Sequence, residues 1–264
     1  MPFIHVNDIT IHYSDEGETS APTIVFSNSL GTDFRIWDAV IARLKSLKLN
    51  ARFFRYDKRG HGLSDVTPQP YRMDQHVDDL IALLDVLDIK DAVLIGLSVG
   101  GMIVQGVYGK RPDLVRALVL SDTGHKIGEE SMWNDRINAV NKGGIEALET
   151  SILERWFSES YRKADNPDFL GYRNMLLRTP LDGYCGTSAA LRDADYTEIA
   201  KLISIPTMLL VGSNDGSTPP EMMATTHELI ANSRFEIIDG PGHLPCIEEP
   251  DETARLFLDF YKGL

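Results

Sequence analysis

The sequence predicts an α/β fold: a mostly parallel sheet of eight strands, with helices on both faces and one inserted helical cap. Two observations lead to this prediction. Short apolar runs alternate with longer amphipathic stretches, which is the pattern of parallel strands joined by crossover helices. Between Asp122 and Ile205 the strand pattern stops and a helical pattern replaces it, which indicates the insertion. A chain of 264 residues is long enough to form one large core.

Eight short segments have the composition of strands. The first two are separated only by the Asn7-Asp8 turn, which predicts an antiparallel pair at the edge of the sheet. The expected strands are Phe3–Val6, Thr10–Tyr13, Thr23–Phe26, Arg52–Tyr56, Ala92–Ile95, Arg116–Leu120, Thr207–Val211 and Arg234–Ile238.

Helices are expected between the strands, where apolar side chains recur at helical spacing. Val77, Leu80 and Leu84 define one such apolar face. The segment Thr218–Glu221, which contains two prolines, has the form of a capping box and predicts the start of a helix. The expected helices of the core are Asp33–Leu47, Met73–Leu87, Val99–Tyr108, Glu221–Ile230 and Glu252–Tyr261.

The helical insertion is expected to form a cap of roughly residues 126–200, with residues 1–125 and 201–264 as the core. Open α/β sheets bind ligands beyond the carboxyl ends of their strands, and a cap there would form a roof over the site. The insertion is also rich in aromatic side chains: Trp133, Trp156, Tyr161, Tyr172 and Tyr184.

Composition restricts the class of partner. The formal net charge is -13 and no basic stripe offsets it, which argues against binding to nucleic acid or to an anionic membrane. The two cysteines, Cys185 and Cys246, form neither a disulfide framework nor a zinc-site pattern. We find no secretory signal and no apolar run long enough for a membrane span, so a cytoplasmic protein is expected. The sequence does not indicate an oligomeric state.

The strongest chemical signal is the string Gly96-Leu97-Ser98-Val99-Gly100. It follows a predicted buried strand and opens a predicted helix, which is the setting of a nucleophile elbow. In such an elbow the serine lies on a sharp, strained turn beside the free N–H groups of the helix start. We therefore expect Ser98 to be a nucleophile; the alternative is a glycine-rich turn with an incidental serine.

A serine hydroxyl needs a neighbouring base that takes its proton. The expected base is His243, which lies in the loop between the last predicted strand and the final helix. His61, in the turn Asp57–Gly62, is expected to be structural, and His125 is an alternative candidate for the floor of the pocket. The other histidines are expected at the surface or at an edge of the sheet: His5, His12, His76 and His227.

The third catalytic group should be an acid that orients the histidine and stabilises its charged form. Asp215 follows the strand Thr207–Val211 and gives the chain order Ser, Asp, His, which a nucleophile-elbow enzyme requires. Its rival is Asp122, which follows the preceding strand. An Asx turn would also explain Asp215.

An oxyanion hole needs two backbone N–H donors. One is expected to be the N–H of Val99, the residue after the nucleophile. The other should come from the loop Ser27–Gly31 after the third strand, and Leu30 is the expected donor.

Taken together, these motifs resemble the α/β-hydrolases along nearly the whole chain. The motifs that carry the resemblance are Ser27–Gly31, Asp57–Ser64, the elbow around Ser98, Asp215-Gly216 and Gly242-His243. The resemblance implies the α/β-hydrolase fold with its mostly parallel eight-stranded sheet.

More narrowly, the chain resembles the 3-oxoadipate enol-lactonases of aromatic catabolism. The segment Asn28–Gly31 stands where most α/β-hydrolases carry His-Gly. The cap contributes four further segments to the resemblance: Trp133–Arg136, Arg155–Phe157, Gly183–Cys185 and Ala189–Asp193.

This resemblance implies a serine hydrolase that opens 3-oxoadipate enol-lactone, a small lactone with a free carboxylate, without a cofactor or a metal. The carboxylate needs a cation, and Arg136 is the expected one. It lies one helical turn from Trp133, which would form an apolar wall beside the ring. The ordinary alternatives are that Arg136 is a surface charge and that Trp133 is part of the cap core.

Other activities share the same catalytic groups. A carboxylesterase, or a hydrolase of carbon–carbon bonds in ring-cleavage products, would differ only in its pocket. A haloalkane dehalogenase or an epoxide hydrolase would need an aspartate at the position of Ser98. A different class is a lactone receptor built on the same fold, which would turn over its ligand very slowly.

Overall fold

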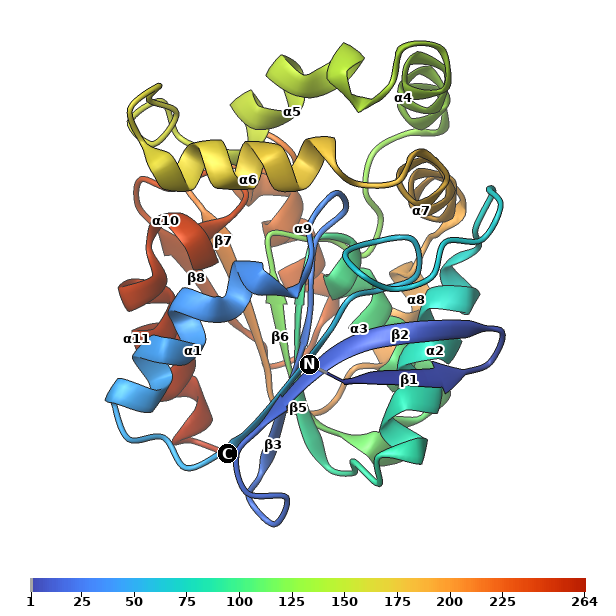
Figure 1. Cartoon of the computed structure of the whole chain (residues 1–264). Coiled ribbons are helices and arrows are strands. Elements are labelled where there is room, and N and C mark those ends of the chain that lie inside the picture. The colour runs from blue at the N-terminus through green and yellow to red at the C-terminus, as the bar shows by residue number, and fades with distance from the viewer. Residues whose placement is uncertain (1) are drawn as a thin grey trace.

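The computed structural model describes residues 2–264 and shows one eight-stranded sheet with helices on both sides (Figure 1). The strands are β1 (Phe3–Val6), β2 (Ile9–Glu16), β3 (Thr23–Ser27), β4 (Arg52–Tyr56), β5 (Ala92–Leu97), β6 (Val115–Ser121), β7 (Thr207–Gly212) and β8 (Arg234–Ile238). Their order is β1-β2-β4-β3-β5-β6-β7-β8. β2 pairs antiparallel with β1 and β4, and all other neighbours are parallel. The predicted fold class is confirmed.

The central strands are mostly apolar because both of their faces are covered. Every residue of β3, β4, β5 and β7 is buried, as expected for a parallel sheet between two layers of helices. The parallel register aligns the carboxyl ends of these strands: Ser27 lies beside Gly96, and Leu97 lies beside Ser121. The loops that follow them therefore meet at one edge of the sheet.

The core helices lie where the sequence predicts them, with one exception. They are α1 (Asp38–Ser46), α2 (Met73–Val86), α3 (Val99–Lys110), α9 (Pro220–Leu229) and α11 (Pro250–Tyr261), together with the short helix α10 (Pro245–Glu248), which was not expected. The predicted helix Asp33–Leu47 is divided into a 3-10 helix, Phe34–Trp37, and α1. The Asp33 side chain caps the 3-10 helix by accepting a hydrogen bond from the Arg35 N–H.

The prediction of a capping box at Thr218–Glu221 was wrong. Helix α9 begins at Pro220, Pro219 is its N-cap, and no side chain caps it. The Thr218 hydroxyl instead donates a hydrogen bond of 2.7 Å to the Asp215 carboxylate. Two prolines with fixed φ are enough to begin this helix, so the threonine is free to serve the neighbouring loop.

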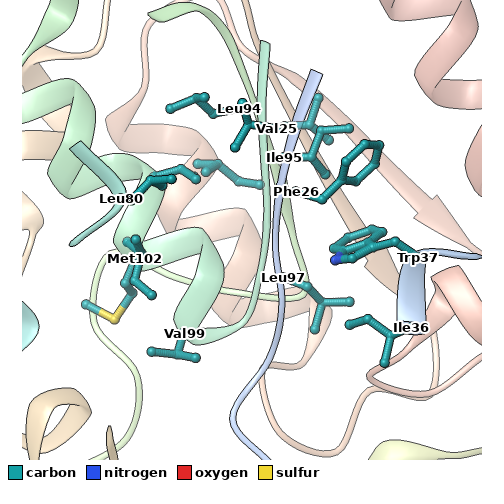
Figure 2. Packing of buried hydrophobic residues seen from close by; sticks show 14 of the residues in the cluster. Val25, Phe26, Ile36, Trp37, Leu80, Leu94, Ile95, Leu97, Val99 and Met102 are labelled. Carbon is teal, nitrogen blue, oxygen red and sulfur yellow. The ribbon is translucent and has the colours of Figure 1, made fainter. Parts of the chain in front are cut away.

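The hydrophobic core fills both sides of the sheet. In Figure 1, α1 and α11 cover one face, and α2 and α3 cover the other. Figure 2 shows Trp37 against Phe26 on the first face, with ring centroids 5.2 Å apart. Leu80 and Met102 lie on the opposite side of the central strands. This packing fixes the strand ends from which the site is built.

Between β6 and β7 the chain forms the inserted helices α4 (Glu130–Gly143), α5 (Glu149–Trp156), α6 (Pro167–Leu177), α7 (Leu181–Asp193) and α8 (Thr197–Leu202), with a 3-10 helix at Ile145–Leu148. Helices α4 to α7 lie beyond one end of the sheet (Figure 1). Helix α8 packs against α3 and α9 of the core. The division into a core and a cap at residues 126–200 stays a proposal.

Two further observations concern expectations made from the sequence. No helix within residues 2–264 is long and apolar enough to cross a membrane. The expectation that His12 and His76 lie at the surface was wrong, because both are buried. His12 Nδ1 lies 2.7 Å from the Asp57 carboxylate, and His76 Nε2 lies 3.2 Å from the Thr187 hydroxyl. These partners come from distant segments, which the sequence does not bring together.

Candidate active site

Ser98 lies on a sharp turn between β5 and α3. Its backbone has φ 57° and ψ -120°, a left-handed conformation that costs a non-glycine residue free energy. The flanking glycines are needed for close approach. A Cβ on Gly96 would lie 2.2 Å from the Gly100 carbonyl oxygen, and a Cβ on Gly100 would lie 2.1 Å from that of Ser27. The string at residues 96–100 therefore has the geometry of a nucleophile elbow.

Hydrogen bonds hold the strained residue in place. The Ser98 N–H donates to the Ser121 carbonyl at 3.0 Å, and the Thr123 hydroxyl donates to the Ser98 carbonyl at 2.6 Å. Both partners lie at the end of β6, the strand beside β5: Ser121 is its last residue and Thr123 lies just beyond it. The elbow is thus fixed by its neighbouring strand as well as by its own glycines.

His243 lies in the loop between β8 and α10, as the sequence predicts. This loop passes close to the end of β7, because a Cβ on Gly212 would lie 2.2 Å from the Gly242 carbonyl oxygen. His243 Nδ1 lies 2.9 Å from Asp215 Oδ2, and both side chains are buried. His243 and Ser98 line the same cavity, so the structure brings the predicted nucleophile, base and acid together.

The loop around Asp215 favours a charged carboxylate. The carboxylate accepts hydrogen bonds from the N–H groups of Ser217 (2.7 Å) and Thr218 (3.1 Å) and from the Thr218 hydroxyl. Burial alone would raise the pKa of Asp215, but His243 and these hydrogen bonds lower it below its ordinary value. A carboxylate in this state can orient the imidazole and stabilise its protonated form.

Asp122, the rival acid, has a different environment. It is fully buried, and its two carboxyl oxygens accept hydrogen bonds from the Gly212 N–H (2.9 Å) and the Ser121 hydroxyl (2.6 Å). Burial and the neighbouring Asp215 raise the pKa of Asp122 well above its usual range. Both effects favour the protonated form of Asp122, and the geometry favours Asp215 as the partner of the histidine.

A metal ion is not needed to explain this cluster. Asp122, Asp215 and His243 each offer a donor atom, and these atoms lie within 4.8 Å of one another. The carboxyl oxygens, however, already accept hydrogen bonds from protein donors, and the histidine nitrogen that faces them is paired with Asp215. That the site works without a metal stays a prediction.

The two backbone donors expected for an oxyanion hole are those of Leu30, in the loop after β3, and Val99, at the start of α3, and this role stays a prediction. Within residues 2–264, no hydrogen-bond acceptor faces the backbone N–H of Leu30 or that of Val99. The next N–H, that of Gly31, donates to His61 Nε2 at 3.0 Å. Burial lowers the pKa of His61 well below its usual range, so the ring is neutral and can accept this bond. His61 therefore has the structural role that the sequence predicts, and it supports the oxyanion loop.

The cavity that contains Ser98 and His243 has a volume of about 90 Å³. Leu30, Trp133 and Arg136 also line it, as the sequence analysis expects. His125 does not: its Nδ1 lies 3.0 Å from the Thr226 hydroxyl on α9. Arg155 and Tyr184 also line the cavity; the sequence analysis places both in segments that carry the resemblance but assigns neither to the substrate site.

The two arginines lack acidic partners. Arg136 donates to the Tyr184 hydroxyl at 3.2 Å, and its guanidinium lies over the Trp133 ring, 5.1 Å from the centroid. Neither Arg136 nor Arg155 forms an ion pair within residues 2–264. Burial and the nearby charge of Arg136 lower the pKa of Arg155. Such a cavity has an excess of positive charge that an anion would neutralise.

A second, larger cavity of about 740 Å³ lies between the 3-10 helix Phe34–Trp37 and α6. It contains neither Ser98 nor His243, and its charged residues include both acids and arginines. The smaller cavity is the candidate active site because the reactive groups converge there.

The fold, the elbow and the Asp215–His243 pair together define a hydrolase of the α/β type, and the chain belongs to the alpha/beta hydrolase family, whose family model matches residues 24–256. It is 35% identical to 3-oxoadipate enol-lactonase 1 of Acinetobacter baylyi, over 97% of this chain and 94% of that protein. The crystal structure of the enol-lactonase from Burkholderia xenovorans LB400 is also similar, with 31% identity, a TM-score of 0.94, and coverage of 99% and 100% of the two chains. A thermophilic esterase from Thermogutta terrifontis has 25% identity and a TM-score of 0.89, over 97% and 94% of the chains.

Proposed function

We propose that this α/β-hydrolase is a serine enzyme that opens 3-oxoadipate enol-lactone to 3-oxoadipate, as part of aromatic compound catabolism. The observation that carries the proposal is the pair Arg136 and Arg155, which line the same cavity as Ser98 and His243 and have no acidic partner in the described chain. Two unneutralised guanidinium groups favour a substrate with a carboxylate. The similarity to two enol-lactonases supports the same substrate.

The proposed reaction uses Ser98, His243 and Asp215 in turn. His243 takes the proton of Ser98 as the hydroxyl oxygen attacks the lactone carbonyl. The N–H groups of Leu30 and Val99 stabilise the oxyanion. When the intermediate collapses, the ring C–O bond breaks and the enol oxygen leaves with the proton from His243, while the acyl group stays on Ser98. Throughout this step Asp215 stabilises the protonated imidazole.

Hydrolysis of the acyl-enzyme completes the cycle. His243 removes a proton from water, which attacks the acyl carbonyl, and the Ser98 oxygen leaves with the proton from the imidazole. The enol oxygen is less basic than an alkoxide, so ring opening needs little acid assistance. The enol then converts to the ketone, which gives 3-oxoadipate.

The cap supplies the substrate contacts in this proposal. Arg136 is held in place by the Tyr184 hydroxyl and by the face of Trp133, so its fork is oriented before the substrate binds. Arg155 has no such anchor and would pair directly with the carboxylate. Trp133 donates its indole N–H to the Ile127 carbonyl at 2.7 Å, which leaves its apolar face for the lactone ring.

A carboxylesterase is the second candidate, and two observations favour it. The catalytic groups themselves require no charge on the substrate, and Leu30, Trp133 and Trp156 give the cavity apolar walls. The chain is also similar to a thermophilic esterase. An esterase would hydrolyse a neutral ester at least as efficiently as the anionic lactone.

The test compares two substrates and two arginine variants. We expect Arg136→Met and Arg155→Met each to lower kcat/KM on 3-oxoadipate enol-lactone by about tenfold to hundredfold, which is the value of a hydrogen bond to a charged group. On the neutral ester p-nitrophenyl acetate we expect changes within about twofold. Wild-type kcat/KM on the lactone should lie within about 10⁴–10⁸ M⁻¹s⁻¹.

The matched control is Arg173→Met, because Arg173 lies on α6 of the same cap and pairs with Glu149 outside the cavity. It should leave both substrates unaffected. Equal losses on the lactone and on the neutral ester would contradict an anion site. A wild-type enzyme that prefers the neutral ester would favour the carboxylesterase, and turnover far below the enzymatic range on both substrates would favour a receptor.

A further inference from the structure

Lys58 is the buried lysine of the described chain, and its side chain is 1% exposed. No carboxylate lies within ion-pair distance of its Nζ in residues 2–264. Burial lowers the pKa of Lys58 to about 7, against the opposing effect of the charges on Asp57 and Asp33. A buried amine without an acidic partner is costly, so its hydrogen bonds must have a structural or functional value.

Its neighbours in the chain have other partners. The Asp57 carboxylate accepts hydrogen bonds from the N–H groups of Phe34 (2.9 Å) and Leu63 (3.0 Å). Arg59 forms a bidentate pair with the buried Asp79, at 2.9 Å for both contacts. Asp57 and Arg59 therefore stabilise the turn to which they belong and the start of the chain. The Lys58 side chain, in contrast, contacts a different segment.

Both hydrogen bonds of Lys58 go to residues 29–32 in the loop after β3, here called the oxyanion loop because it contains Leu30. Its Nζ donates to the Ser29 carbonyl oxygen at 2.5 Å and lies 3.5 Å from the Thr32 carbonyl oxygen. The Ser29 oxygen also accepts bonds from the Thr32 hydroxyl (2.9 Å) and the Thr32 N–H (3.3 Å). Three donors therefore fix the position of this one carbonyl group.

The Ser29 carbonyl and the Leu30 N–H belong to the same peptide group. A trans peptide is planar, and its C=O and N–H point in opposite directions. When the oxygen is anchored on the side of Lys58, the N–H is aimed the other way. Leu30 lines the cavity that contains Ser98, and its N–H has no acceptor among the described residues.

We propose that Lys58 is a positioning residue for the oxyanion hole: by holding the Ser29 carbonyl, it sets the direction of the Leu30 N–H. A donor on the carbonyl oxygen also polarises the peptide group and makes its N–H a stronger donor. Lys58 itself touches no substrate. The inference rests on the proposed function, because it needs Ser98 to form a tetrahedral intermediate.

The test replaces Lys58 by methionine, which keeps the length of the side chain and removes the donor. With p-nitrophenyl acetate we expect kcat to fall about tenfold to hundredfold, below the hundredfold to thousandfold loss on deletion of a direct donor. KM should stay within about twofold, because the neutral ground state gains little from the oxyanion hole. A trifluoromethyl ketone, which forms an oxyanion adduct with the nucleophile, should lose affinity by the same factor as kcat/KM.

The ketone measurement separates positioning from a merely structural role. A protein that is only destabilised would lose active fraction, but its folded molecules would bind the ketone as the wild type does. Lys58→Gln retains a shorter donor and should give an intermediate loss of kcat and of ketone affinity. If Lys58→Met does not fold, the same comparison is made with Lys58→Gln. The control is Lys262→Met, which removes an exposed ammonium from the same core.

The outcomes distinguish this inference from the proposed function. A folded Lys58→Met or Lys58→Gln variant with kcat and ketone affinity within about twofold of the wild type would overturn the inference alone. So would a loss of kcat without a matching loss of ketone affinity. A wild-type protein that neither turns over an ester nor reacts at Ser98 with a phosphonate would instead overturn the proposed function.

Discussion

The strained backbone of Ser98 is the residue-scale feature on which the site depends. A left-handed φ on a serine persists only where surrounding contacts determine it, and here Ser121 and Thr123 supply those contacts. This conformation places Ser98 at the tip of the turn, at the start of α3, where its side chain lines the cavity. The N–H of Val99 is placed beside it by the same turn.

The roles of the two buried aspartates differ at the residue scale. Asp215 carries the charge, because it accepts several hydrogen bonds and faces His243. Burial and the neighbouring Asp215 raise the pKa of Asp122, which favours its protonated form. The sequence places both at strand ends and favours Asp215 over its rival Asp122, but the difference in their pKa values arises from contacts across the sheet.

Amide substitutions distinguish these roles. Asp215→Asn should lower kcat on the lactone by about 10⁴-fold, because the amide cannot stabilise the protonated imidazole or hold the right tautomer. Asp122→Asn should lower kcat by less than about tenfold, because an amide resembles a protonated carboxyl in shape and charge. Both are measured at neutral pH. A larger loss in Asp122→Asn than in Asp215→Asn would assign the acid to Asp122.

At the scale of elements, the strands are the most predictable feature. β3, β5 and β7 are buried throughout and mostly apolar because helices cover both of their faces, so their sequence alone marks them. Helix starts are less predictable. The segment Thr218–Glu221 satisfies the pattern of a capping box, but prolines begin α9 without a side-chain cap. The competing partner of Thr218 lies in the preceding loop, and only the folded structure shows that the hydroxyl reaches Asp215.

Thr218→Val tests this reassignment. The variant removes the hydroxyl that donates to Asp215 at 2.7 Å and keeps the shape of the side chain. We expect kcat to fall about threefold to tenfold, in line with about 1 kcal/mol for one hydrogen bond. The free energy of unfolding in urea should fall by about 1 kcal/mol at most, which is the contribution of the one buried hydrogen bond. A loss of stability with kcat unchanged would instead support a capping role.

At the scale of the whole molecule, the cavity lies between the strand ends and the helices inserted between β6 and β7. Arg136 lies on α4 and Arg155 on α5, whereas Ser98 and His243 belong to the core. The sequence indicates Arg136 through its spacing from Trp133 on one helix. It gives no comparable signal for Arg155, whose approach to Gly216 is a contact between cap and core. Short-range sequence patterns therefore predict Arg136, whereas Arg155 is identified only by the structure.

The overall charge and the local charge have opposite signs. The net charge of -13 repels an anionic substrate at long range. Exposed charges are screened over about 8–10 Å at physiological salt, so the enclosed arginines decide whether a carboxylate binds. In the proposed function this arrangement makes the cavity selective for a carboxylate, while the acidic surface contributes little to recognition.

The most direct test of the account is the site of reaction with an organophosphonate probe, measured by mass spectrometry of the intact and digested protein. We expect a single adduct on the peptide that contains Ser98, and no adduct in Ser98→Ala. Such a result would establish the nucleophile on which the triad, the oxyanion hole and the role of Lys58 all depend. An adduct on another serine, or labelling that persists in Ser98→Ala, would contradict the account.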